Sequence, residues 1–187
     1  MTEQGRLIGV VGPSGVGKDT VMRALSEARP GLRLVRRVIT RAGSAVGEDC
    51  DVVTPQEFEV RREVGAFALH WQAHGMSYGV TQAIGGQLAE GHDLLVNLSR
   101  SVLARAQAGF PGFVTLLLTA SEDVLRARLM QRGRESEAEV EDRLARRDFA
   151  LPEGLERVIE VHNDGDLDGT VNAALAALYP ENVRRVI

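Results

Sequence analysis

The chain has 187 residues, of which 44% are hydrophobic, 26% charged and 4% aromatic, a profile typical of a globular protein with an aliphatic core. Its net charge of −4 argues against non-specific binding to nucleic acid, and its single cysteine excludes an internal disulfide. No stretch approaches the roughly 18 apolar residues of a membrane span, and the apolar run at residues 7–11 is too short for a signal peptide. We therefore expect a cytoplasmic protein with neither nucleic acid nor membrane as a partner.

Short apolar runs alternate with amphipathic segments along the chain, as in βαβ units with parallel strands. In the first part of the chain we expect a strand at 7–11, a helix at 19–28, a strand at 34–40 and a glycine-rich loop at 42–49. A helix at 55–64, opened by a capping box at Thr54, is followed by an extended segment at 66–73, a turn-rich connection at 74–80 and a helix at 81–90. The rest of the chain has expected strands at 94–98, 113–118 and 158–161, and expected helices at 102–108, 121–131, 137–149, which is highly charged, and 166–178. The predicted fold class is α/β, with about five parallel strands and helices on both faces of the sheet.

Residues 12–18 read Gly-Pro-Ser-Gly-Val-Gly-Lys and lie directly between the first strand and the first helix. This is the context of a Walker A phosphate loop, in which glycines let backbone N–H groups surround the phosphates of ATP. Lys18 is the only lysine in the chain, and we expect its charge to assist transfer of the γ-phosphoryl group. A glycine-rich turn with no ligand is the alternative. The predicted contacts to ATP are Gly12, Pro13, Ser14, Gly15, Val16, Gly17, Lys18, Asp19 and Thr20.

The position after Lys18 departs from the motif, because it holds Asp19 in place of the usual Ser or Thr that binds Mg²⁺. Thr20 cannot substitute, since one residue rotates a side chain by about 100° around a helix. A carboxylate can itself ligate Mg²⁺, so Asp19 is the predicted metal ligand. The alternative is that Asp19 only complements the helix N-terminus.

Motifs beyond the phosphate loop resemble those of the guanylate kinase-like nucleoside monophosphate kinases. They are Thr40-Arg41, Gly47-Glu48, Gly75-x-x-Tyr78-Gly79, Arg128-Leu129-x-x-Arg132-Gly133-Arg134-Glu135, Glu141-Asp-Arg143-Leu144 and Asn163-Asp164. The resemblance implies a P-loop NTPase fold with a core of residues 1–32, 93–132 and 144–187, a substrate-binding insertion at about 33–92 and a lid at about 133–143. It also implies that Asn163 lies beside the adenine and that three lid residues act on the transferred phosphoryl group. These are Arg132, Arg134 and Arg143.

The chain departs from guanylate kinases where guanine is read. Leu69 stands where that family has a glutamate that accepts hydrogen bonds from the base, and Val96-Asn97-Leu98-Ser99 replaces its Leu-Asp-Ile-Asp. A base-reading site without its polar groups loses the hydrogen bonds that make it selective. Guanylate is therefore not the expected substrate.

With these departures, the sequence resembles the ribose 1,5-bisphosphate phosphokinase family. The likeness rests on Gly12 to Asp19, on the blocks at 36–41, 47–49 and 65–75, and on Val96-Asn-Leu-Ser-Arg100. It implies phosphorylation of ribose 1,5-bisphosphate by ATP, with Mg²⁺, to 5-phospho-α-D-ribose 1-diphosphate in phosphonate breakdown. The alternatives are a nucleoside monophosphate kinase with altered base choice and a non-catalytic guanylate kinase-like interaction module. Oligomeric state is not decided by the sequence, and a homodimer stays open.

A sugar bisphosphate calls for arginines and hydrogen-bond donors in its pocket, in place of a purine slot. Of Arg36 and Arg37, we expect only one to point inward, because adjacent strand residues face opposite ways. His70 and His74 are secondary candidates that strand alternation would place on one face. The acceptor phosphate is already ionised, so no general base is needed. The predicted substrate contacts are Arg37, Arg41, His70, His74, Tyr78 and Arg100.

Overall fold

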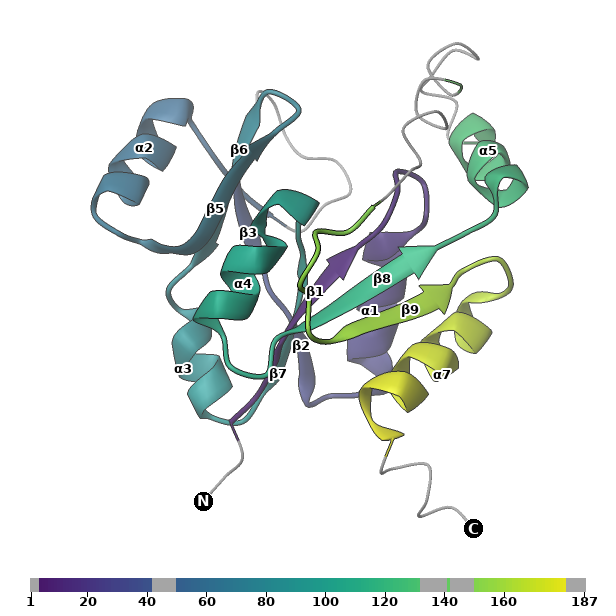
Figure 1. Ribbon diagram of the computed structural model, residues 1–187. Helices are drawn as coiled ribbons and strands as arrows, with labels where there is room; N and C mark the ends of the chain where they lie inside the picture. Colours follow the sequence, from purple (N-terminus) through teal and green to yellow (C-terminus); the bar gives the residue numbers. More distant parts are fainter. Residues whose placement is uncertain (1–3, 42–49, 132–140, 142–149, 181–187) are drawn as a thin grey trace.

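Five parallel strands form the main sheet of the computed structural model, which describes residues 4–41, 50–131, 141 and 150–180 (Figure 1). In sheet order the strands are β2 (Leu32–Leu34), β7 (Asp93–Asn97), β1 (Leu7–Val11), β8 (Val114–Thr119) and β9 (Val158–His162). Every neighbouring pair runs parallel. The predicted five-stranded α/β sheet is confirmed.

Helices cover both faces of this sheet, which explains why its central strands are mainly apolar. All five residues of β1 are buried. Side chains of one core cluster come from the helices on one face, and those of a second cluster come from the helices on the other. The first face carries α1 (Lys18–Ala28), α5 (Glu122–Gln131) and α7 (Leu167–Leu178). The second carries α3 (Ile84–Ala89), the 3₁₀ turn η1 (Arg100–Val102) and α4 (Leu103–Gly109).

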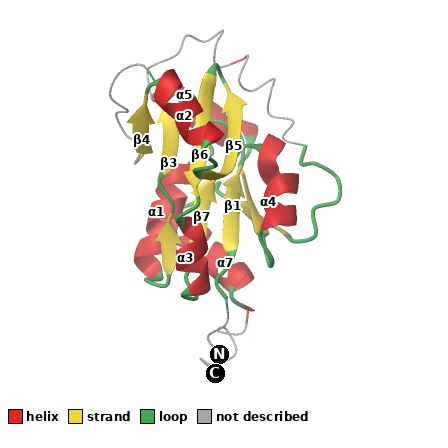
Figure 2. Ribbon diagram, turned by 90° about the vertical axis from the view of Figure 1, so that its left-hand side faces the viewer, coloured by secondary structure: helices red, strands yellow, loops and turns green. Residues whose placement is uncertain are grey.

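A second sheet lies above the first in Figure 2 and has four strands. Its order is β4 (Cys50–Val53), β3 (Arg37–Thr40), β6 (Met76–Thr81) and β5 (Phe67–Ala73). The strands β3 and β4 run parallel, whereas β6 is antiparallel to both β3 and β5. The helix α2 (Pro55–Glu63) is capped by Thr54, whose side chain and that of Glu57 form the predicted capping box.

Two predictions for this region are wrong. The strand predicted at 34–40 is two strands in different sheets, because Val35 donates to Leu95 O at 2.9 Å at the end of β2 and the chain then leaves the main sheet. The connection predicted at 74–80 contains β6. Gly79 indicated a turn, but a Cβ there would lie 2.5 Å from the Phe67 ring, so the glycine provides room for a neighbouring side chain.

Most other elements match their predicted positions within a few residues. The helix predicted at 81–90 is shorter and begins at Ile84. The helix predicted at 137–149 lies outside the described residues except at Glu141, which is helical. Within the described ranges, no helix combines the length and apolar character needed to cross a bilayer.

Candidate active site

The phosphate loop connects β1 to α1 and is closely packed on the main sheet. A Cβ at Gly12 would lie 2.3 Å from Leu118 O, so the loop can leave β1 at this point only without a side chain. Gly17 caps α1 with φ of 91°, in the left-handed region that favours glycine. The glycine spacing of the motif is therefore required by the packing of this loop and by its backbone path.

The ammonium group of Lys18 lies against the start of the same loop. It donates to Gly12 O at 2.9 Å and to Pro13 O at 3.1 Å. These bonds keep the single lysine charge of the chain beside the backbone N–H groups that would surround a phosphate.

The first turn of α1 and the end of β7 meet next to this loop. The amide of Asn97 donates to Asp19 Oδ1 at 3.3 Å, and the exposed carboxylate of Asp19 offers the hard oxygen atoms that suit Mg²⁺. Arg37 in turn donates to Asn97 O at 3.2 Å. Asn97 thus links the predicted metal ligand to a predicted substrate contact.

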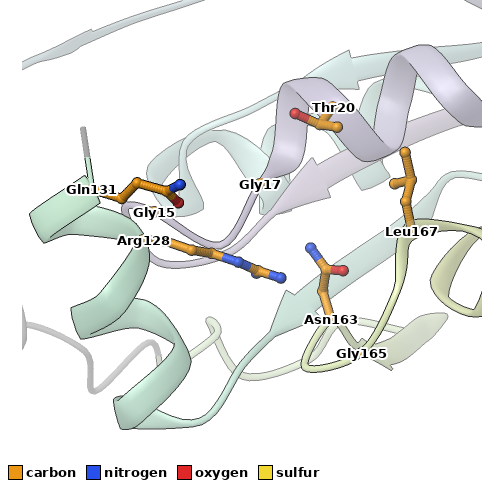
Figure 3. Close-up of a pocket in the computed structure, with 8 residues that line it drawn as sticks. All are labelled: Gly15, Gly17, Thr20, Arg128, Gln131, Asn163, Gly165 and Leu167. Atoms are coloured by element: carbon orange, nitrogen blue, oxygen red, sulfur yellow. The ribbon is translucent and has the colours of Figure 1, made fainter.

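A pocket of about 280 Å³ opens beside the phosphate loop (Figure 3). Arg128 reaches across it from α5, opposite Asn163 from the end of β9, and donates to Val16 O at 3.4 Å. The pocket is lined by Gly15, Gly17, Thr20, Arg128, Gln131, Asn163, Gly165 and Leu167.

Four of these lining residues were not among the predicted contacts to ATP. Arg128 and Gln131 lie three residues apart on α5, so they share one helix face. Arg128 is also the first residue of the motif that resembles the lid entry of the family, and this motif was the only sequence signal that could have identified it as a site residue. Gly165 lies in the loop between β9 and α7, and Leu167 is the first residue of α7. Neither residue belongs to a motif quoted from the sequence.

Asn163 lies in this pocket wall but is only 5% exposed. Its amide nitrogen donates to Val16 O at 2.7 Å, and its amide oxygen accepts from the Thr170 hydroxyl at 2.8 Å. Both ends of the side chain therefore bind the protein itself.

Arg37 and Tyr78 come together on the second sheet. The Arg37 guanidinium lies 5.5 Å from the centre of the Tyr78 ring, which stacks on Trp71 with ring centres 5.4 Å apart. Arg36 instead pairs with Asp51 at 2.9 Å, and its side chain is 56% exposed. The expectation that only one of the two arginines points inward is confirmed.

Two other predicted arginines, Arg100 and Arg41, lie in the described part of the chain. Arg100 begins η1 directly after β7 and donates to Ala150 O at 3.3 Å. Arg41 is exposed at the end of β3 and precedes residues 42–49, which lie outside the described residues.

The two histidines do not share a strand face, contrary to the prediction. His74 lies beyond the end of β5, in the hairpin turn, with φ of 52°. His70 neighbours Trp71 on β5, so it faces away from the Arg37–Tyr78 side. Burial, followed by the charges of Arg105 and Arg62, lowers the pKa of His70 and keeps the ring neutral at neutral pH. The structure brings neither histidine into the Arg37–Tyr78 cluster.

Comparison with known proteins shows the family of this chain. A family model described as AAA domain matches residues 8–147. A ribose 1,5-bisphosphate phosphokinase of a Ruegeria species is 52% identical over 95% of this chain and 94% of its own length. One from Pseudomonas paraeruginosa is 49% identical over 93% of this chain and 95% of its own. The chain belongs to the ribose 1,5-bisphosphate phosphokinase family.

Solved structures with the same fold include more distant kinases. A guanylate kinase from Anaplasma phagocytophilum has a TM-score of 0.62 and 20% identity, covering 96% of this chain and 87% of that one. A gluconokinase from Sinorhizobium meliloti has a TM-score of 0.54 and 23% identity, covering 98% of this chain and 97% of that one. At these identities the likeness shows the P-loop kinase fold alone.

One interpretation of the departure from guanylate kinases needs correction. Leu69 was interpreted as an apolar replacement within a base-reading site, yet it is 4% exposed and packs in the core with Leu7, Val11 and Trp71. A register shift between Phe67 and Leu69 turns the strand at this point, so that Phe67 joins a different core cluster with Phe58. In this member of the phosphokinase family, Leu69 is a packing residue.

The three predicted lid residues, Arg132, Arg134 and Arg143, lie outside the described residues. The helix that leads to them is held by Asp164, which accepts from the backbone N–H of Ser121 at 2.6 Å. That bond lowers the pKa of Asp164 and joins the start of α5 to the loop after β9.

Proposed function

We propose that the protein transfers the γ-phosphoryl group of ATP to the 1-phosphate of ribose 1,5-bisphosphate, giving ADP and 5-phospho-α-D-ribose 1-diphosphate. The observation that carries the proposal is that relatives 40–52% identical over most of the chain are named for this substrate. The role in phosphonate breakdown and the cytoplasmic location expected from the sequence are part of the same proposal.

The nucleotide side of the proposal is supported by the geometry around Lys18. The phosphate loop, the adjoining pocket and Arg128 line one continuous region, with Gly15 and Gly17 shared between loop and pocket. The triphosphate would bind along the loop, and the base would enter the pocket. Asp19 would hold Mg²⁺ together with phosphate oxygens and water, because Mg²⁺ is commonly bound through one or two carboxylates plus substrate phosphates.

The acceptor side is supported by the cluster around Arg37. This arginine and Tyr78 present donors and positive charge beside Asn97, whose side chain binds Asp19. Arg100 adds a guanidinium in η1, which follows β7. A guanidinium binds a phosphate bidentately, which fixes the direction of the incoming oxygen. Because the attacking phosphate is already ionised, the protein contributes alignment and charge neutralisation. The second sheet would then be the substrate-binding insertion.

An ADP-release assay tests the proposal by comparing ribose 1,5-bisphosphate with GMP, dGMP and AMP as acceptors. We expect turnover with the sugar bisphosphate at least about tenfold above that with any nucleotide, a modest ratio for a site built around different polar groups. Turnover with GMP alone would support a nucleoside monophosphate kinase. Absence of turnover with all four acceptors would support the non-catalytic interaction module.

A further inference from the structure

The backbone carbonyl of Val16, in the phosphate loop, is bound by two side chains. It accepts a hydrogen bond from Asn163 at 2.7 Å and a longer one from Arg128 at 3.4 Å. The first comes from the end of β9 and the second from α5, and both donors line the pocket beside the loop. Two elements distant in sequence therefore hold a single peptide oxygen.

The direction of each bond in this group is fixed by chemistry. A carbonyl oxygen can only accept, so the amide nitrogen of Asn163 must face Val16 O. Its amide oxygen then faces Thr170, whose hydroxyl has a single proton to donate and lies closer to this oxygen, at 2.8 Å, than to Asp166 O, at 3.2 Å. Asn163 and Thr170 are 5% and 4% exposed, so water does not replace these partners readily.

The position of Val16 O determines where the next N–H group points. In a trans peptide, the carbonyl of Val16 and the N–H of Gly17 point in opposite directions, and the described residues contain no cis peptide. Gly17 has φ of 91° and lacks a side chain that would resist rotation of this peptide. Without the bonds to Val16 O, the peptide could flip and turn a carbonyl oxygen, instead of an N–H, toward a bound phosphate.

We propose that Thr170, acting through Asn163, is a positioning residue that locks the Val16–Gly17 peptide in its phosphate-binding orientation. In this proposal Asn163 acts on the phosphate loop from the wall of the pocket, a role beyond the one beside the adenine that the resemblance implied. The proposal rests on the binding of a nucleoside triphosphate in the proposed function, but it does not depend on the identity of the acceptor.

Inorganic tripolyphosphate separates the two roles of Asn163, because it has phosphates but no base. The variant is Thr170→Val, which removes the hydroxyl and keeps the shape, and the measurement is the Kd of ATP and of tripolyphosphate by calorimetry. If the loop is in its competent orientation less often, every ligand of the loop weakens by the same factor. We expect both Kd values to rise about tenfold, and Thr170→Ser to restore them.

Thr115→Val is the matched control, since Thr115 is also a buried threonine but lies in β8. Its Kd values should equal those of the unsubstituted protein. A rise for ATP but not for tripolyphosphate in Thr170→Val would make Asn163 a base contact and overturn the proposal. Equal values in Thr170→Val and Thr115→Val would overturn it as well.

A second measurement needs no substitution and tests the bond between Asn163 and Val16 O even if Thr170→Val does not fold. The side-chain amide protons of Asn163 should exchange with solvent at least about tenfold more slowly than those of Gln56, which is exposed on α2. Equal exchange rates would mean that the bond to Val16 O is not maintained, and the proposal would fail.

Discussion

Lys18 is the residue on which the proposed chemistry depends most directly. It is held 2.9 Å from Gly12 O, where its charge can move onto a phosphate as negative charge develops. We expect Lys18→Met, which keeps the length of the side chain but removes the charge, to lower kcat by about 10²–10³-fold in the ADP-release assay. Thermal unfolding provides the control and should change little. Near-normal turnover would contradict the assignment of this loop to phosphoryl transfer.

Leu69, in contrast, is expected to affect stability and not turnover, although its position suggested a role in the choice of acceptor. Its side chain is 4% exposed among apolar neighbours, so Leu69→Glu buries a carboxylate with no polar partner. We expect a loss of about 3 kcal/mol or more in the free energy of unfolding, with no gain of GMP turnover. Leu69→Met, which conserves volume, should cost under about 1.5 kcal/mol. A folded Leu69→Glu protein that phosphorylates GMP would show that position 69 faces the acceptor.

At the scale of elements, local signals predicted the main sheet better than the second one. The strands β1 and β8 are buried and mainly apolar because helices cover both faces of the sheet, and such runs are visible in the sequence. The strand β6 was missed because Ser77 and Gly79 resemble turn residues, whereas the ring of Phe67 explains the glycine. Pairing between β3 and β6 joins residues about 40 positions apart, which no local pattern encodes.

In the candidate site, too, features encoded by consecutive residues were predicted and those that depend on distant residues were missed. The phosphate loop was predicted because strand, loop and helix are consecutive in the chain. The bond from Thr170 to Asn163 was missed because it depends on how α7 packs beside β9, and neither residue type marks such a bond. Asn97 was noticed only as a departure from guanylate kinases, and its link between Asp19 and Arg37 emerged from the structure.

The strand β8 contains a buried hydroxyl group that offers a test of packing within one element. Thr115 is fully buried, and its Oγ1 finds no hydrogen-bond partner among the described residues. We expect Thr115→Val to raise the free energy of unfolding by about 1 kcal/mol, because an unpaired polar group leaves the core. Chemical denaturation measures the change. Thr119→Val is the comparison, since the Thr119 hydroxyl lies 2.8 Å from His162 Nδ1, and it should give no such gain.

At the scale of the whole molecule, one polar cluster joins both ends of the described chain at the opposite edge of the sheet from the phosphate loop. Asp93, at the start of β7, binds the Arg6 guanidinium at 2.6 Å and accepts from the Tyr179 hydroxyl at 2.7 Å. Arg6 also donates to Leu178 O at 3.2 Å, and the Arg29 guanidinium lies 3.7 Å from the centre of the Tyr179 ring. The segment before β1, the sheet and the end of α7 are thereby connected.

This cluster makes stability depend on pH at high pH. Burial, together with the bond to Asp93, raises the pKa of Tyr179 from 10.0 to about 12. Between these values the folded protein keeps a proton that the unfolded chain has released, so its stability falls as pH rises from about 10 to 12. Below pH 10 the stabilisation from this group is fully present and does not change with pH. In Tyr179→Phe nothing titrates at this position, so we expect its stability loss relative to the unsubstituted protein to shrink across that interval. Urea unfolding at pH 8, 10 and 11.5 measures the difference, and a constant difference would show that Tyr179 is not bound to Asp93 in solution.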